Sequence, residues 1–181
     1  EIAAPGFTGV KVYDPLPIAA LAPFIDWSPF FHTWELRGRW DDREQRFKSA
    51  LPESQAEIEP IAARLHQEAR ALLERIIAEN RYTVRGCFGF YPANRTGDDI
   101  EVYTDESRQN VRCVFHTLRQ QIIKKDAPNY ALADFIAPKD SGRADYIGGF
   151  CVGVHGADEF AEEFKKAHDD YNSIMAKALA D

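Results

Sequence analysis

The clearest pattern of hydrophobic and polar positions covers residues 57–80. Apolar residues recur there every three or four positions, the period of an α-helix with one buried face. These positions are Ile58, Ile61, Ala62, Leu65, Ala69, Leu72, Leu73, Ile76 and Ile77. The intervening residues are mostly charged or amide side chains, which suits a solvated face with ion pairs one turn apart. The pattern predicts one long amphipathic helix over residues 57–80.

After residue 80 the pattern changes to short runs rich in β-branched and aromatic residues, which indicate strands. Four runs are found, at residues 84–91, 99–104, 111–117 and 146–155. Turn-forming residues such as Asn94 and Gly97 separate the first two runs. We expect an antiparallel meander, with the long helix and a C-terminal helix covering one face. Strands in the middle and helices at both ends indicate an α+β fold rather than an alternating one.

The N-terminal part is punctuated by glycine and proline. Residues 1–16 show little periodicity and are expected to be a linker or arm from a preceding domain, so the domain itself would cover residues 17–181. Residues 17–21 could form one helical turn. A second short helix is expected with Ser28 as its cap and Pro29 at its first position, ending near Gly38.

The last segment, residues 158–181, carries a second helical stripe. Its apolar positions are Phe160, Phe164, Ala167, Tyr171, Ile174, Met175, Ala178 and Leu179. Within it, the cluster of His168, Asp169 and Asp170 is interpreted as a solvated helical face. This helix lacks a capping residue at its end and the chain lacks an initiator Met, so we expect a fragment of a longer polypeptide.

The composition limits the classes of partner. The chain has 181 residues, of which 45% are hydrophobic and 28% charged, which suits one globular domain burying roughly 70% of its unfolded surface. A net charge of -7 and a pI near 5.3 argue against nucleic acid, whose partners usually present a basic surface. The apolar runs are shorter than the roughly 20 residues of a membrane span, and no signal pattern is present. We therefore expect a cytoplasmic protein without nucleic-acid or membrane partners.

Metal binding and nucleophilic catalysis find no support in residue spacing. The five histidines form no HExxH motif, and no Ser or Cys is placed locally with a His and an acid. Cys87, Cys113 and Cys151 are widely spaced and lie in apolar segments, so they are expected to be buried free thiols. We expect neither a catalytic residue nor a metal ligand in this chain.

Asp26 is the most informative single residue, because it lies among large apolar and ring side chains in residues 23–31. A carboxylate in such surroundings needs a partner. It could cap the short helix that follows, which is a common use of Asp. Alternatively it could hold the cationic amino group of an amino-acid-like ligand, with Trp27 and Phe30 covering the apolar part or facing a sulfonium. The residues alone leave both open.

Several multi-residue blocks resemble one known family. They are Pro23-Phe24-Ile25-Asp26-Trp27, Leu118-Arg119-Gln120-Gln121, Leu132-Ala133-Asp134-Phe135, Phe90-Tyr91-Pro92-Ala93-Asn94-Arg95 and Asp169-Asp170-Tyr171-Asn172 with the following residues to Asp181. In this order they resemble the activation domain of cobalamin-dependent methionine synthase, a methyltransferase. The resemblance runs from about Leu16 to Asp181, with a poorly matching insert at residues 41–60.

The resemblance implies a C-shaped α+β domain whose twisted antiparallel sheet and flanking helices form a groove for S-adenosyl-L-methionine. In that family, methyl transfer from this ligand and one-electron reduction return cob(II)alamin to methylcobalamin. The cobalamin is held by a cobalamin-binding domain of the same polypeptide, and the electron comes from an external reductant of the flavodoxin or reductase type. Asp26 would contact the methionine end of the ligand, with Trp27 and Phe30 as neighbours. Asp181 would contact a neighbouring domain.

Other family contacts lie in an Arg-Pro-x-Pro-Gly-Tyr block that would follow Asp181. The resemblance therefore implies that residues 17–181 are the larger N-terminal part of an activation domain and are inactive alone. Two alternatives stay open. One is an interaction or scaffold domain of the same fold that has lost the donor site, and the other is a reactivation domain for a different corrinoid protein.

Overall fold

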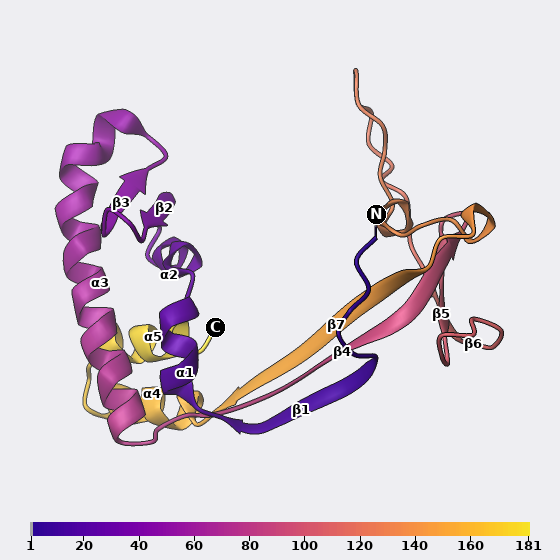
Figure 1. The fold of residues 1–181 in the computed structure, drawn as a ribbon. Coiled ribbons are helices and arrows are strands. Elements are labelled where there is room, and N and C mark those ends of the chain that lie inside the picture. The colour runs from indigo at the N-terminus through magenta and orange to yellow at the C-terminus, as the bar shows by residue number, and fades with distance from the viewer. Residues whose placement is uncertain (1) are drawn as a thin grey trace. The chain divides into compact units, whose positions relative to one another are not determined.

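A computed structural model of the chain describes residues 2–181. The chain divides into two compact units, which are described separately (Figure 1). The first contains residues 1–13 and 86–151, and the second contains residues 14–85 and 152–181. Strands β1 (Gly9–Leu16), β4 (Thr83–Thr96) and β7 (Asp145–His155) each contribute residues to both units. The chain therefore passes from one unit to the other three times, each time within a strand.

The first unit is built on a five-stranded sheet in the order β1-β4-β5-β6, with β7 also paired to β4. The remaining strands are β5 (Asp99–Tyr103) and β6 (Val111–His116). Antiparallel pairing runs from β4 to β5, with Ala93 opposite Val102, and then from β5 to β6. The four predicted strands are thus confirmed, and the first three follow one another as a meander. The fourth does not continue it, because β7 pairs with β4. Asn94 was expected in the turn after the first strand, but β4 continues through it to Thr96, and Asn94 pairs with Glu101 of β5.

Residues 1–16 were expected to be an arm, and this was wrong for residues 9–16, which form β1. Val10 and Val12 alternate there with polar or ring residues, but six of the eight strand residues are exposed. The strand is therefore held by its hydrogen bonds to β4 rather than by burial. A pattern search for buried positions cannot detect such a strand.

The second unit contains five α-helices and a hairpin (Figure 1). The helices are α1 (Ile18–Leu21), α2 (Trp27–Thr33), α3 (Gln55–Ala78), α4 (Ala157–Lys166) and α5 (Asp170–Ala178). The hairpin is formed by β2 (Gly38–Asp41) and β3 (Arg46–Ser49). Short 3-10 turns at Ala22–Phe24 and Pro52–Ser54 precede α2 and α3.

Helix α3 confirms the long helix predicted at residues 57–80, with both ends shifted by two residues toward the N-terminus. Its end is marked by Asn80, whose φ of 51° belongs to the left-handed region. Arg64 and Glu68 pair at 2.7 Å on its solvated face, as Arg75 and Glu79 do at 2.8 Å. The charged positions between the apolar ones are therefore ion pairs one turn apart, as the spacing indicated.

Two residues were expected as possible caps of α2, and Asp26 is confirmed while Ser28 is wrong. Asp26, not Ser28, is the N-cap, and its Oδ1 accepts a hydrogen bond from the backbone N–H of Ser28 at 2.9 Å. Ser28 lies inside the helix, where its hydroxyl accepts from the backbone N–H of Trp40 at 3.3 Å. Both residue types favour caps, so the sequence alone could not decide between two candidates two positions apart.

The C-terminal segment was expected to be one helix, but it forms two. Between α4 and α5 the chain turns at His168, whose φ is 60°. Asp169 then caps α5, with its Oδ1 accepting from the backbone N–H of Asn172 at 3.0 Å. The cluster of His168 and Asp169 is therefore a helix break and a new cap, not a solvated helical face.

The hairpin β2–β3 was not predicted, and it overlaps the start of the poorly matching insert at residues 41–60. Trp40 and Phe47 are cross-strand partners that both point into the core. Gly38 was expected to end a helix, but it opens β2 at a point with no room for a side chain. A Cβ at this position would collide with the carbonyl oxygen of Lys48 and would lie 2.6 Å from the ring of Phe47.

The buried residues form two separate clusters. The larger combines α2, α3, α4, α5 and the hairpin, and the smaller consists of Ala93, Ile100, Val102 and Ala133 of the first unit. The helices thus bury their apolar faces against one another and the hairpin, which differs from the expected helical layer on one face of the sheet.

The three cysteines were expected to be buried, and this was wrong, because Cys113 and Cys151 are exposed and Cys87 is half-buried.

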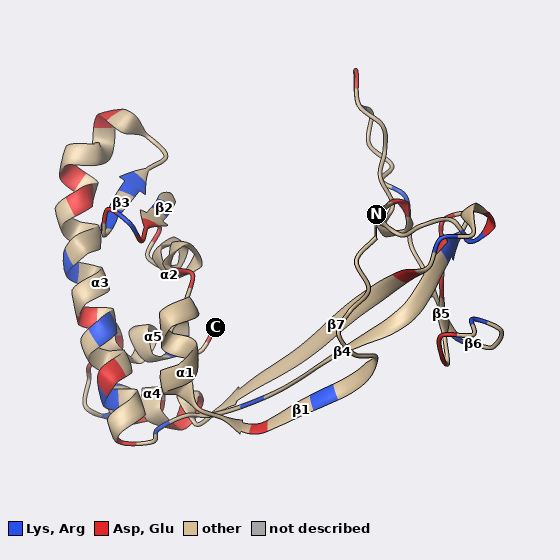
Figure 2. Ribbon diagram, viewed as in Figure 1, with Lys and Arg blue, Asp and Glu red and all other residues tan. Residues whose placement is uncertain are grey.

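No helix in the described part of the chain is both long and apolar enough to cross a membrane. Charged residues are spread along α3, as Figure 2 shows, whereas α1 and α2 contain none.

His66 packs against aromatic residues of the larger cluster and is 7% exposed. Its ring centroid is 4.0 Å from that of Trp40 and 4.6 Å from that of Trp27. Burial lowers the pKa of His66, the charge of Arg70 lowers it further, and Asp42 opposes these effects weakly. The folded state therefore prefers the neutral imidazole.

We expect acid to destabilise the second unit through His66. Its folded pKa lies below the unfolded value of about 6.5, so its contribution is complete above that pH and is lost as the pH falls toward the folded pKa. Denaturant unfolding at about pH 7.5 and about pH 5 should show a smaller loss of stability for His66→Phe than for the wild type. The exposed His155→Gln variant is the control and should behave as the wild type. An unchanged loss in His66→Phe would contradict the prediction.

Gly38 gives a second test of the core. Replacing it with Ala should lower the free energy of unfolding by about 1–3 kcal/mol, because the added methyl group meets the backbone of Lys48 and the ring of Phe47. Gly149→Ala is the control, since a Cβ there meets no atom within 4 Å. Urea unfolding measures both. Equal stability of the two variants would show that the hairpin adjusts freely.

Candidate functional site

The second unit contains a cavity of about 450 Å³ beside Asp26. Its walls come from α1, α2, the beginning of β4, the end of β7 and residues 178–181. The lining is mostly apolar, with Ile18, Leu21, Ile25, Leu73, Val84, Val152, Val154 and Leu179 among its members. A mostly apolar concave site with a few polar groups, in the range of about 300–1,000 Å³, is typical of small-molecule binding.

Asp26 is an exposed residue at the edge of this cavity. As the cap of α2, it uses Oδ1 to accept from Ser28. Its Oδ2 has no hydrogen-bond or ion-pair partner among the described residues, so one carboxylate oxygen is available to a ligand. The two interpretations of Asp26 left open by the sequence are therefore compatible, because the cap occupies only one oxygen.

Trp27 and Phe30 also line the cavity, but most of their surface belongs to the core. Their exposed fractions are 7% and 5%. The two rings meet edge to face with centroids 5.5 Å apart, and Trp27 contacts His66 on another side. Only the remaining edges of these rings are available at the cavity wall.

Asp181 lines the same cavity from the chain segment that follows α5. The end of α5 is held by Tyr82, whose hydroxyl donates to the backbone carbonyl of Ala176 at 2.6 Å. Burial raises the pKa of Tyr82, so this hydroxyl remains a donor. The four residues named from the sequence, Asp26, Trp27, Phe30 and Asp181, thus come together on one cavity.

Tyr82 and the aliphatic residues of β4 and β7 also line this cavity, although they were not predicted as site residues. Val152 and Val154 alternate along β7, which is a signal for one strand face but not for a ligand. Tyr82 lies just before β4 with no pattern around it. Only the folded chain shows that it lies beside α5.

The chemistry of the lining is restricted. Asp26 and Asp181 are its only charged residues, and its other polar side chains are the hydroxyls of Thr33 and Tyr82 and the indole of Trp27. The described residues contain no cluster of three or more His, Cys, Asp or Glu that could hold a metal ion. The cavity can therefore bind and orient a ligand, but its lining offers neither a thiol nor an imidazole for catalysis.

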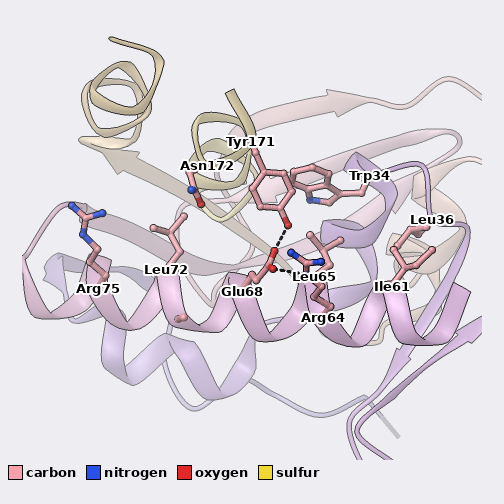
Figure 3. A pocket seen from close by; sticks show the side chains of 11 residues that line it. Trp34, Leu36, Ile61, Arg64, Leu65, Glu68, Leu72, Arg75, Tyr171 and Asn172 are labelled. Carbon is pink, nitrogen blue, oxygen red and sulfur yellow. Dashed lines mark hydrogen bonds and ion pairs between the residues drawn. The ribbon is translucent and has the colours of Figure 1, made fainter. Parts of the chain in front are cut away.

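A larger and more open groove of about 920 Å³ runs along α3 (Figure 3). Trp34 and Tyr171 lie over Glu68, which accepts from the hydroxyl of Tyr171 and pairs with Arg64 at 2.7 Å. Burial, together with the bond to Glu68, raises the pKa of Tyr171 to about 12. The same bond, with that from Arg64, lowers the pKa of Glu68. These polar groups satisfy one another, so the cavity beside Asp26 is the stronger candidate.

The fold is α+β and has a cavity of a size typical of small-molecule sites, and comparison with known proteins gives the family of the chain. Residues 17–181 match the family described as vitamin B12 dependent methionine synthase, activation domain. The chain belongs to this family, which confirms the resemblance read from its motifs.

One similar solved structure is described as the crystal structure of the MetH reactivation domain bound to AdoHcy. It is 44% identical in sequence, with a TM-score of 0.76. The match covers 97% of this chain and 51% of that chain, so this chain spans about half the length of the structure it matches. The α+β fold expected from the sequence is confirmed by this likeness.

Proposed function

We propose that this chain binds S-adenosyl-L-methionine in the cavity beside Asp26 and serves the reductive methylation of cob(II)alamin to methylcobalamin. The observation that carries the proposal is the cavity itself, where a carboxylate with a free oxygen meets apolar walls. The similar structure is bound to AdoHcy, which is what remains of S-adenosylmethionine after its methyl group has been transferred. Family membership supports the same ligand.

In this proposal the residues of the chain bind and orient the methyl donor. The free oxygen of Asp26 accepts hydrogen bonds from the cationic amino group of the methionine part, a charge-assisted contact. The aliphatic walls exclude water from the rest of the ligand, and the accessible edges of Trp27 and Phe30 cover its apolar part or face the sulfonium. Cobalamin, held by another domain, would supply the nucleophile that the lining lacks.

The partners follow from the same proposal. A cobalamin-binding domain of the same polypeptide and an external one-electron reductant of the flavodoxin or reductase type would complete the reaction in the cytoplasm. Asp181 is exposed and stays a predicted contact with a neighbouring domain. Because this chain spans half of the matched structure, these residues are proposed to form part of the donor site and to be inactive alone.

Two alternatives remain, because this chain spans only half of the matched structure. The first is a scaffold domain of the same fold that has lost the donor site. It predicts that the polypeptide, as its gene encodes it, binds no S-adenosylmethionine. A domain that reactivates another corrinoid protein predicts binding of the donor without homocysteine methyltransferase activity. Calorimetry and a methyltransferase assay separate these outcomes.

Asp26 allows the two roles of its carboxylate to be tested separately. Asp26→Asn keeps a side-chain acceptor at the cap but removes the charge, so it should weaken S-adenosylmethionine binding about 10- to 100-fold with little change in stability. Asp26→Ala should weaken binding similarly and also lower stability by about 1 kcal/mol. Isothermal calorimetry and urea unfolding on the polypeptide as its gene encodes it measure both effects.

Asp169→Ala is the matched control, because Asp169 caps α5 in the same way but does not line the cavity. It should lose about 1 kcal/mol of stability and keep the affinity of the wild type. If Asp26→Asn bound the ligand as tightly as the wild type, Asp26 would be only a cap.

A further inference from the structure

The charged residues at the cavity beside Asp26 are all acidic. Asp26 and Asp181 both line it, and no Lys, Arg or His does. Neither carboxylate has an ion-pair partner among residues 2–181. Lys177, one turn before Asp181, pairs instead with Asp158 at 3.1 Å.

Several carboxylates elsewhere in the structure form ion pairs with Lys or Arg side chains. Lys48 lies 2.7 Å from Asp41, and Arg119 lies 2.7 Å from Asp134. The cavity therefore carries two negative charges whose counter-charge is not supplied by the described residues. A ligand that brings positive charge would complete it.

The methyl donor and its product differ in this respect. S-adenosylmethionine carries an ammonium, a carboxylate and a sulfonium, whereas its product carries only the first two because its sulfur is a neutral thioether. The ammonium satisfies one carboxylate in either case. The second carboxylate has a cationic partner only while the sulfonium is present.

We propose that Asp181 is a specificity-determining residue that makes this cavity favour the sulfonium-bearing donor over the thioether product. The inference rests on the proposed function, and it assigns to Asp181 a role at the ligand in addition to the predicted contact with another domain. Loss of the methyl group then removes the charge that Asp181 attracts, so the product leaves more readily than the donor.

The expected preference for the donor over the product follows from the electrostatics of a half-enclosed site. One extra charge a few ångströms from a carboxylate, at an effective dielectric between those of protein and water, favours the donor about fivefold to tenfold. Asp181 is exposed, which argues for the lower end of this range at physiological salt.

The test compares three ligands by calorimetry in the polypeptide as its gene encodes it. These are S-adenosylmethionine, its thioether product, and sinefungin, in which a carbon bearing an amine replaces the sulfonium. The wild type should bind both cationic ligands more tightly than the product. Asp181→Asn should reduce that preference about fivefold to tenfold and change the affinity for the product less than about twofold.

Glu162→Gln is the matched control, because it removes the same charge from an exposed position on α4 outside the cavity. It should keep the preference of the wild type. Thermal unfolding should be the same for Asp181→Asn and the wild type, since no side-chain hydrogen bond to Asp181 is lost.

The outcomes separate this inference from the function on which it rests. If the wild type binds none of the three ligands, both fail. If it binds them through Asp26 but Asp181→Asn keeps the full preference, or loses affinity for donor and product equally, only the role of Asp181 is overturned. A defect of Asp181→Asn confined to docking with the cobalamin domain would overturn it in the same way.

Discussion

The burial of one face of α3 determines most of the second unit. Ala62, Ala69 and Ile76 on this face are fully buried, and the hairpin, α2 and the C-terminal helices pack around them. The side chains that close the core from the hairpin are aromatic, with Phe31 lying 4.9 Å from Phe47 between ring centroids. Large rings bury much area but require close geometric fit, because interiors are packed to the density of organic crystals. The position of α2, and with it that of Asp26, follows from this packing.

Asp26 shows how one carboxylate can serve structure and binding together. A helix leaves its first N–H groups unpaired, and the cap satisfies one of them with a single oxygen. The same contact restricts the rotation of the carboxylate, and Asp26 lines the cavity. A ligand that used its second oxygen would not have to immobilise a freely rotating side chain. Such preorganisation is a general source of affinity.

The sequence predicted the parts of the fold that follow from periodic burial. The long helix, the meander of β4, β5 and β6, and the grouping of Asp26 with Trp27 and Phe30 all came from local pattern or from motif resemblance. The missed elements share another property. Strand β1 is mostly exposed, and the hairpin depends on Trp40 and Phe47 meeting across a turn. The break at His168 depends on a left-handed backbone conformation, which an unbroken apolar stripe conceals.

The candidate site could be predicted only in part from the sequence, because some of its residues come together only in the folded chain. Asp181 came from resemblance alone, and nothing local indicated that it would share a cavity with a residue 155 positions earlier. Tyr82 was missed because its partner is a backbone carbonyl far along the chain. Contacts of this kind depend on the completed fold and leave no periodic signal.

The hydrogen bond from the hydroxyl of Tyr82 to the backbone carbonyl of Ala176 joins two segments that are far apart in the sequence. Burial raises the pKa of this phenol above its usual value, so the link between the start of β4 and the end of α5 keeps its donor at neutral pH. The imidazole of His66 makes the neighbouring core sensitive only on the acid side. The part of α5 that leads to Asp181 is therefore held by a hydrogen bond whose donor keeps its proton across the ordinary range of cellular pH.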